Sequence, residues 1–278
     1  MMMSESWLKL TNQVCVVTGA TGGMGEKICF EFAKQGAVVV LIDIKAAALA
    51  ALKQKLETET GATVYVENCD VTDPAAVEAA SRSIVAEAGR IDVLVNTAGI
   101  LKFAPLEDLK YETWQQVLKV NLDGYFLTAQ TFGKVMKAQG HGSMVHISTV
   151  ASLAPETYSG AYSTSKAGVN MLSKQIAAEW GQYGVRSNVL MPCLVKTPMS
   201  MPFYADPEVE NGRKKLTANK RIGTVQDIAD GVLFLASDRA SYVNGAALPV
   251  DGGFNMMMGD QIPKPGGRKQ YAIDHETD

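Results

Sequence analysis

The residues of this sequence best suited to chemistry are a tyrosine and a lysine four positions apart, Tyr162 and Lys166. On a helix, residues with this spacing share one face, with Cβ atoms roughly 5–6 Å apart. A free phenol has a pKa of about 10 and is a poor base at neutral pH. An ammonium group at about 4 Å contributes about 4 kcal/mol at an effective dielectric of ~20. We therefore expect Lys166 to lower the pKa of Tyr162 by up to ~3, which suits general acid–base catalysis.

Thr149 is a second polar residue whose position fits the same site. It stands 13 positions before Tyr162, just after a predicted strand over 143–147. There its hydroxyl would hold a substrate oxygen and stabilise developing charge. Ser148 precedes it and would point to the other face of the strand if the strand continued, because side chains alternate along a strand. We favour Thr149 and keep Ser148 as the alternative.

Asn121 lies in the middle of a predicted helix, where asparagine is a poor helix former. One interpretation is a role in the site, in which Asn121 holds a water in a proton path to Lys166. The alternative is a buried, hydrogen-bonded amide of the core. A tyrosine and a lysine four positions apart also occur by chance on exposed helix faces. The prediction of catalysis therefore depends on Asn121 and Thr149 accompanying the pair.

A glycine-rich loop, Thr-Gly-Ala-Thr-Gly-Gly-Met-Gly over 18–25, follows the first predicted strand and precedes a helix. Glycine permits a tight turn and a close approach of backbone to ligand, and a helix N-terminus suits a pyrophosphate. The spacing differs from G-x-G-x-x-G, and packing of the helix on the strand is the alternative reason for these glycines. The residues expected to contact a dinucleotide here are Gly19, Thr21, Gly23, Met24 and Gly25.

Asp43 ends the second apolar strand, where a carboxylate can accept hydrogen bonds from the ribose hydroxyls of adenosine. Its charge would repel a 2′-phosphate, and the loop over 20–24 contains no Arg or Lys. NAD is therefore favoured over NADP as the cofactor, although Lys45 lies close by. The alternative role of Asp43 is to cap the helix that begins near Lys45.

The third and fourth predicted strands also end in small or polar residues. Ligands of open parallel sheets bind beyond the carboxyl ends of the strands. Four such ends in succession predict one crevice for the cofactor, with an adenine edge near Asp70 and Val71. The fourth strand end adds Asn96, Ala98 and Gly99 to the expected cofactor contacts.

The elements that must position these residues alternate between strand and helix along the whole chain. Continuous apolar runs such as Ala-Val-Val-Val-Leu-Ile over 37–42 are typical of parallel strands buried on both faces. The alternation predicts an α/β fold with a doubly wound, seven-stranded parallel sheet and helices on both faces. The predicted strands are 13–18, 37–42, 62–67, 91–95, 143–147, 185–191 and 246–250. The predicted helices are 22–35, 46–59, 74–88, the largely helical 107–138, 160–183 and 225–237. Asp73 is the predicted cap of the helix over 74–88.

Composition limits the function classes. With 278 residues, 47% of them hydrophobic, one α/β domain accounts for the length. A net charge of −3 gives no electrostatic footprint for nucleic acid or an anionic membrane. The N-terminus does not read as a signal peptide, and no apolar run is long enough for a bilayer, so we expect a cytoplasmic protein. No metal site is expected, because the cysteines form no C-x-x-C pair and no His lies at metal-ligand spacing from them. The four cysteines are expected to be small buried hydrophobes: Cys15, Cys29, Cys69 and Cys193.

Together these motifs resemble the classical short-chain dehydrogenase/reductase family, over about 10–253. The resemblance rests on the glycine loop, Asp-Val at 70–71, Asn-Thr-Ala-Gly at 96–99, Asn121, His-Ile-Ser-Thr at 146–149, the Tyr–Lys pair, Met-Pro-Cys-Leu-Val-Lys-Thr-Pro-Met at 191–199 and Val-Asp-Gly-Gly at 250–253. It departs from the usual family pattern where Thr149 replaces a serine, Thr97 an asparagine and Cys193 a glycine.

The resemblance implies a Rossmann-type domain over 1–253, with a mobile substrate lid at about 198–221 and a C-terminal extension over 254–278. It implies NAD(P) binding, a catalytic set of Tyr162, Lys166, Thr149 and Asn121, and a homotetramer or homodimer. Cofactor contacts would include Tyr162 and Lys166 themselves. Near the nicotinamide the resemblance adds Pro192, Val195 and Thr197.

The function expected is an oxidoreductase that moves a hydride between NAD(H) and a small secondary alcohol, sugar, polyol or ketone. One alternative is a non-catalytic nucleotide-binding or scaffold protein on the same fold, since a fold does not fix function. Another is enoyl reduction or epimerisation, but enoyl-reducing relatives space their tyrosine further from the lysine, and Tyr158, eight before Lys166, does not match their pattern. The basic lid residues, which include Arg213, would meet an anionic substrate group or form a solvated helix face.

Overall fold

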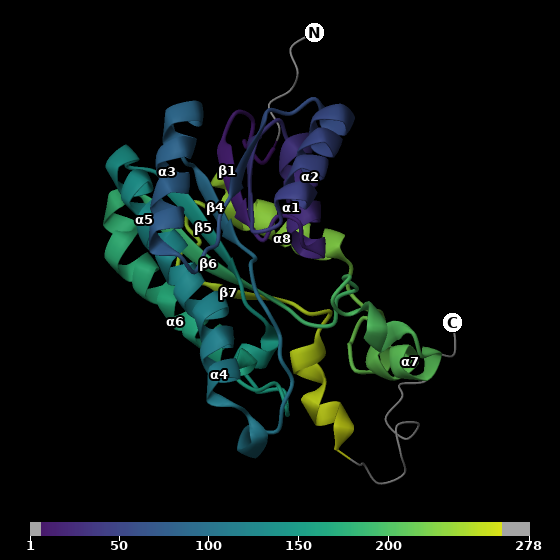
Figure 1. The fold of residues 1–278 in the computed structure, drawn as a ribbon. Coiled ribbons are helices and arrows are strands. Elements are labelled where there is room, and N and C mark those ends of the chain that lie inside the picture. The colour runs from purple at the N-terminus through teal and green to yellow at the C-terminus, as the bar shows by residue number, and fades with distance from the viewer. Residues whose placement is uncertain (1–6, 263–278) are drawn as a thin grey trace, which may run out of the picture.

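The computed structural model describes residues 7–262, which form one parallel sheet covered by helices on both faces (Figure 1). The strand order is β3-β2-β1-β4-β5-β6-β7, and every paired strand is parallel, which confirms the predicted doubly wound α/β fold. The order reverses between β1 and β4, where open α/β sheets bind ligands. The strands are β1 Val14–Thr18, β2 Val38–Asp43, β3 Val64–Asn68, β4 Val93–Asn96, β5 Gly142–Ile147, β6 Val185–Pro192 and β7 Ala247–Val250.

Each central strand feeds two separate hydrophobic cores, which explains why its sequence is continuously apolar. Val14 and Val16 pack into one core with Ile84 of α3, whereas Cys15 and Val17 pack into the other. In Figure 1, α3, α5 and α6 cover one face of the sheet, and α1, α2 and α8 cover the other. The helices are α1 Gly23–Lys34, α2 Ala46–Thr60, α3 Pro74–Ala88, α4 Tyr111–Leu118, α5 Gly124–Gln139, α6 Tyr162–Trp180, α7 Pro207–Lys215 and α8 Val225–Ala236.

Helix ends lie within a few residues of the predicted ones because local capping chemistry marks them. The Asp73 carboxylate accepts from Ala75 N and Ala76 N at the start of α3, as predicted. The segment 107–138 was predicted to be largely helical, and its α-helix begins only at Tyr111, after a 3-10 turn at Leu106–Asp108. A π-helical segment, Lys119–Asp123, separates α4 from α5, and it contains Asn121. The extra residue in this turn directs the Asn121 side chain inward, where backbone groups of a neighbouring loop bind it.

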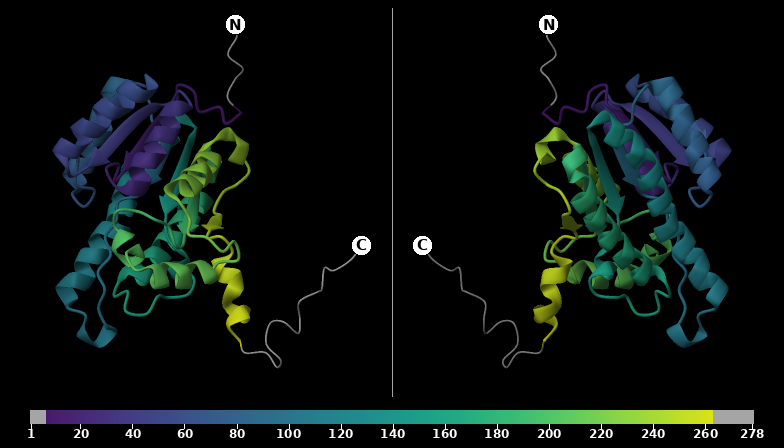
Figure 2. Two further views of the ribbon diagram at one scale, coloured as in Figure 1. Left: turned by 90° about the vertical axis from the view of Figure 1, so that its right-hand side faces the viewer. Right: turned by 90° about the vertical axis from the view of Figure 1, so that its left-hand side faces the viewer.

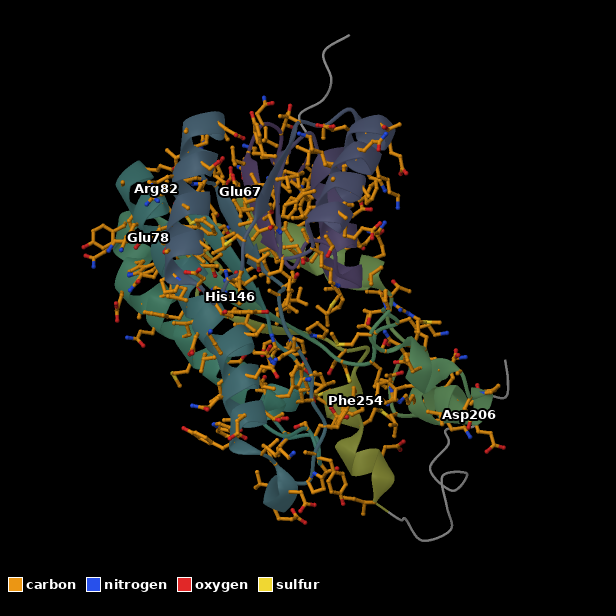
Figure 3. All side chains as sticks on the ribbon, viewed as in Figure 1. Glu67, Glu78, Arg82, His146, Asp206 and Phe254 are labelled. Carbon is orange, nitrogen blue, oxygen red and sulfur yellow. The ribbon has the colours of Figure 1, made fainter. Side chains whose placement is uncertain are left out.

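Three short elements gather beyond the carboxyl end of the sheet: α4, the lid and the C-terminal 3-10 helix Phe254–Gln261 (Figure 2). The lid comprises the 3-10 helix Met201–Tyr204 and α7. Figure 3 shows Asp206 of the lid and Phe254 at this end, with His146 deeper in the molecule. The Met256 side chain of the C-terminal 3-10 helix is 80% exposed. The first six residues and most of the expected C-terminal extension, 263–278, lie outside the described chain.

Four observations complete the description of residues 7–262. No helix among them is both long and apolar enough to cross a bilayer. The described part also contains no group of three His, Cys, Asp or Glu arranged to hold a metal. Cys15, Cys29 and Cys69 are buried, as expected for small hydrophobes. Cys193 is half-buried, and it lies at the site described next.

Candidate active site

Tyr162 and Thr149 meet at the carboxyl end of β5. Tyr162 begins α6, and the Thr149 side chain hydrogen-bonds with it. Thr149 adopts extended backbone as the N-cap of the 3-10 turn Val150–Ser152, where its hydroxyl accepts from Ala151 N at 3.2 Å. Ser148 is buried, and its hydroxyl donates to the Lys166 backbone carbonyl at 3.0 Å. The structure therefore places Thr149, and not Ser148, against the tyrosine.

Lys166 is buried beneath this pair, and its amine has two partners. Nζ donates to the Ile147 carbonyl at 2.8 Å and to the Tyr125 phenol oxygen at 3.0 Å. It also lies 4.5 Å from the centre of the Tyr125 ring. Burial lowers the pKa of Lys166 to about 7, because a charged amine is poorly solvated there.

The predicted lowering of the Tyr162 pKa by Lys166 is not found in this structure. Burial, aided by the charge of Glu156, raises the pKa of Tyr162 to about 12, while the Thr149 hydrogen bond opposes the rise. The expectation treated Lys166 as a full charge close to the phenol. In the fold both side chains are buried. Burial lowers the pKa of the amine and so reduces its charge, and the amine hydrogen-bonds to Tyr125 and Ile147.

Asn121 fits the description of a buried core amide. Its Oδ1 accepts from Ile100 N at 2.8 Å, and its Nδ2 donates to the Ile100 carbonyl at 2.9 Å and to Ser165 Oγ at 3.2 Å. The amide thereby ties the loop after β4 to α6. Gly99 lies above it, and a Cβ there would stand 3.3 Å from Asn121 Oδ1 and 3.7 Å from Lys166 Nζ. The side chain positions the wall of the site, and the expected water path to Lys166 stays a prediction.

The glycine loop has the geometry of a phosphate cradle. Gly19 has φ +64°, and a Cβ on Gly25 would stand 2.3 Å from the Gly19 carbonyl oxygen, so α1 approaches the loop as only glycine allows. The N-cap of α1, Gly22, offers no side-chain hydrogen bond, which leaves backbone N–H groups at this helix end for an anion. These features fit the pyrophosphate of a dinucleotide.

Asp43 hydrogen-bonds to the glycine loop and to the backbone just before α2, whose N-cap is Lys45 without a side-chain cap, so Asp43 does not cap this helix. Its Oδ2 accepts from Thr21 N at 3.1 Å and from the Thr21 hydroxyl at 2.7 Å, and its Oδ1 accepts from Lys45 N at 3.2 Å. A carboxylate offers about four acceptor sites. Three of these sites are used by Thr21 and Lys45, so one acceptor site on Oδ1 stays open to a ribose hydroxyl. The contact of Asp43 with a ribose hydroxyl stays a prediction.

The other predicted strand-end residues differ in what their side chains can reach. Asn96 is 1% exposed, and its side chain contacts Thr18, Thr128 and His146 beneath the crevice. The side chain therefore faces away from the crevice, and the cofactor contact of Asn96 stays a prediction. The alternation of β4 turns this side chain inward. Asp70 is exposed, whereas Val71 packs into the core over Gly124.

A cavity of about 210 Å³ unites eight of the predicted site residues. They come from the glycine loop, the ends of β4, β5 and β6, and α6. The eight are Met24, Gly99, Thr149, Tyr162, Lys166, Pro192, Val195 and Thr197. The remaining predicted residues lie outside its lining: Gly19, Thr21, Gly23, Gly25, Asp43, Asp70, Val71, Asn96, Ala98 and Asn121. Gly23 packs tightly against Pro198, since a Cβ on Gly23 would stand 2.5 Å from Pro198 Cδ.

The lid supplies one cation to this cavity. Arg213 lines it, with its guanidinium 4.7 Å from the Phe203 ring centre and 5.3 Å from that of Tyr204. Lys214 pairs with Glu210 at 2.9 Å, but Arg213 has no ion pair within residues 7–262. The prediction of a solvated basic face therefore fails for Arg213, because the aromatic side chains turn its guanidinium toward the cavity.

Three functional candidates escaped the sequence reasoning: Tyr125, Glu156 and Phe103. Tyr125 stands four positions after Asn121, a helical spacing that offered a signal. Glu156 and Phe103 line the cavity from loops, where no periodicity marks them. Tyr158, by contrast, is 67% exposed and absent from the cavity lining. Among the tyrosines near Lys166 in sequence, it is Tyr162 that faces the site.

The fold and the site together define a doubly wound α/β protein with a glycine phosphate loop and a tyrosine–lysine pair in one crevice. A family model described as Enoyl-(Acyl carrier protein) reductase matches residues 19–255. The D-threitol dehydrogenase of Mycolicibacterium smegmatis is 39% identical to the chain, covering 89% of it and 95% of the relative. The chain belongs to the short-chain dehydrogenase/reductase family.

Two solved structures extend the comparison. A NAD+-bound xylitol dehydrogenase matches with a TM-score of 0.83 and 29% identity, covering 88% of this chain and all of that one (100%). A gluconate 5-dehydrogenase from Burkholderia cenocepacia, in complex with NADP and tartrate, gives 0.85 and 33%, covering 88% and 96%. The chain is thus an oxidoreductase of a family that binds NAD(P) and acts on alcohols, with a small molecule as its substrate.

Proposed function

We propose that the protein is a NAD-dependent dehydrogenase of a polyol or related secondary alcohol, and reduces the matching ketone in reverse. The observation that carries the proposal is the arrangement of Tyr162, Thr149 and Lys166. The phenol and its hydroxyl partner face one cavity, and the amine lies directly below. Thr149 and Tyr162 thereby offer a substrate oxygen two hydroxyls at one point.

In this mechanism Tyr162 exchanges the proton of the substrate oxygen, and Thr149 holds that oxygen while charge develops on it. Lys166 would stabilise the phenolate and would hydrogen-bond the ribose hydroxyls of the cofactor when it is bound, and Asn121 fixes the loop that carries Gly99. The nicotinamide group, when bound, supplies the hydride chemistry. Pro192, Val195 and Thr197 would hold its carboxamide side, and the loop over 19–25 its phosphates. Asp70 and Val71 would meet the adenine, with Ala98 on the crevice wall.

Asp43 supports NAD over NADP. Its carboxylate has one acceptor site left for a ribose hydroxyl, and its negative charge opposes a 2′-phosphate. Thr21 donates to this carboxylate and so couples the glycine loop to the ribose site.

A hydroxyl-rich substrate is supported by one basic and one acidic side chain that line the cavity. Arg213 offers N–H donors and Glu156 offers acceptor oxygens on the same lining. Their opposite charges suit a neutral molecule with several hydroxyls. Relatives named for threitol and xylitol point to the same class.

The assembly, the domain limits and the location of the protein are part of the proposal. Phe126 on α5 and Met171 on α6 are exposed, which supports a homodimer or homotetramer through these helices. Sedimentation velocity distinguishes the states. We retain one Rossmann-type domain over 1–253 with a C-terminal extension over 254–278, in the cytoplasm.

The test replaces Tyr162 by Phe and follows nicotinamide absorbance with a panel of tetritols, pentitols, simple secondary alcohols and ketones. We expect turnover of Y162F to fall at least about a hundredfold, because general acid–base catalysis contributes 10²–10⁴-fold. NADH binding, followed by fluorescence, should change little. The control is Tyr158→Phe, which removes an exposed phenol outside the cavity and should keep full activity. Full activity of Y162F, or no turnover of any alcohol by the wild type, would refute the proposal.

A further inference from the structure

A second buried phenol, that of Tyr125, is bound to the same lysine as the proposed catalytic site. Tyr125 lies on α5, is 1% exposed, and stands four positions after Asn121. Its oxygen accepts from Lys166 Nζ at 3.0 Å and donates to the Ile147 carbonyl at 3.0 Å. Lys166 donates to that same carbonyl at 2.8 Å. The three groups form a closed triangle of hydrogen bonds.

This triangle leaves the amine one direction in which to act. An ammonium group has three donors and no acceptor. Two of the three are directed to Tyr125 and Ile147, and the ring of Tyr125 lies against the amine at 4.5 Å. Lys166 nevertheless lines the cavity, so the third donor faces the side where Tyr162 lies. Because Tyr125 is packed on every side, it holds this orientation without a mobile partner.

We propose that Tyr125 is a positioning residue for Lys166: it directs the amine toward Tyr162 and stabilises the protonated amine. The inference rests on the proposed function of the site and adds to it a residue from a different helix. Two titratable side chains from other elements interact with the amine, Tyr125 of α5 and His146 of β5, and Tyr162 stands four positions before Lys166 on its own helix. The hydroxyl of Tyr125 is the one among them that hydrogen-bonds to it.

The test is Tyr125→Phe, which removes the oxygen and keeps the ring. An amine that loses this acceptor holds its proton less firmly and stabilises the Tyr162 phenolate less. We expect kcat for alcohol oxidation to fall about tenfold, with the KM of the alcohol within about threefold and the rising limb of the pH–rate profile moved to higher pH. Tyr125→Leu, which also lacks the oxygen but differs in shape, should show the same pH shift. The matched control is Tyr65→Phe. Tyr65 lies on β3, and within the described residues its hydroxyl donates only to the Glu87 carbonyl, at 3.5 Å.

An NMR titration of the lysine side-chain amines gives a readout that does not need turnover. The Lys166 resonance should titrate at lower pH in Y125F than in the wild type and in Tyr65→Phe. An unchanged titration and an unchanged pH profile would overturn the role of Tyr125, while the loss of activity in Y162F would leave the proposed function intact. If no alcohol is turned over, the proposed function fails, and the Lys166 titration still decides whether Tyr125 controls the amine.

Discussion

Burial disfavours the charged form of both side chains that carry a proton in the site, Tyr162 and Lys166. It lowers the pKa of Lys166 to about 7 and raises that of Tyr162 to about 12, so each neutral form is favoured. Thr149 is the group that offsets the effect on Tyr162, through its hydrogen bond. A positive charge arriving in the crevice would favour the phenolate. The charge on each of the two groups is therefore expected to respond to what binds beside it.

Asp43 is the residue on which cofactor choice is predicted to depend. Replacing it by Ser removes the negative charge and the open acceptor site, so binding of NAD should weaken and the repulsion of a 2′-phosphate should disappear. We expect the preference for NAD over NADP, as a ratio of kcat/KM, to fall at least about tenfold, which corresponds to ~1.4 kcal/mol.

The control for this substitution is Lys45→Met, because its backbone N–H still reaches position 43 while its charge is lost. The ratio should change little in K45M. A wild type that strongly prefers NADP would contradict the reading of Asp43.

At the scale of elements, the π-helical segment and the lid decide how the cavity is closed. The π-helical segment at Lys119–Asp123 directs Asn121 onto the loop after β4. The lid contributes Phe203, whose ring meets that of Phe103 edge-on at 6.1 Å. An aromatic side chain of the lid thus meets one from a loop beside the cavity, and the guanidinium of Arg213 lies over the rings of Phe203 and Tyr204.

Arg213→Met should affect substrate binding more than the chemical step. Hydrogen bonds to charged groups contribute about 1.5–3 kcal/mol, so we expect the KM of the preferred polyol to rise about tenfold or more, with kcat within about threefold. A simple secondary alcohol that lacks distal hydroxyls should be little affected. Steady-state kinetics with both substrates separates the two effects.

Lys215→Met is the matched control on the same helix, because Lys215 is exposed and does not line the cavity. It should leave both substrates unchanged. An equal loss for the simple alcohol in R213M would mean that Arg213 supports the lid and does not recognise the polyol.

For the whole molecule, the site is one end of a polar network that crosses the sheet. Asn96 links Thr18 of β1 to His146 of β5, and His146 continues to Ser187 of β6 at 3.2 Å. Burial, together with the charge of Lys166, lowers the pKa of His146 to about 3, so the imidazole is neutral. The strands below the crevice are thereby joined by neutral, satisfied groups, which holds the strand ends in register.

Lys166 should make the stability of the protein depend on pH. The unfolded chain keeps its lysine protonated up to about pH 10.4, whereas the folded chain releases that proton near pH 7. Between these values the unfolded state binds the extra proton, so the free energy of unfolding should rise with pH. Relative to Lys166→Met, the wild type should gain at most about 1.4 kcal/mol per pH unit.

Urea unfolding of both proteins at pH 6, 7.5 and 9 checks this prediction. These pH values lie below the range of about pH 10 to 12, in which Tyr162 would make the free energy of unfolding fall with pH. In that range the phenol is protonated in the folded chain, where its pKa is raised to about 12, and ionised in the unfolded chain. A difference between wild type and K166M that stays flat from pH 7 to 9 would show that Lys166 keeps its charge in the fold.

The sequence by itself determined the elements and part of the crevice, because these depend on local patterns. Apolar runs marked the seven strands, Asp73 marked a helix start, and a spacing of four placed Tyr162 and Lys166 on one face. The carboxyl ends of parallel strands must share an edge, so residues from separate strand ends were expected together before any contact was known.

Only the tertiary structure decided which way individual side chains face and what surrounds them. Thr149 rather than Ser148 reaches Tyr162 because the chain turns after β5, and Asn96 faces inward because of its place in β4. Tyr125 and Arg213 approach the site from elements distant in sequence. Such distant contacts decide how deeply Lys166 is buried, and burial decides its pKa. Local spacing therefore predicted that Tyr162 and Lys166 would meet, but it did not predict the charge that each carries.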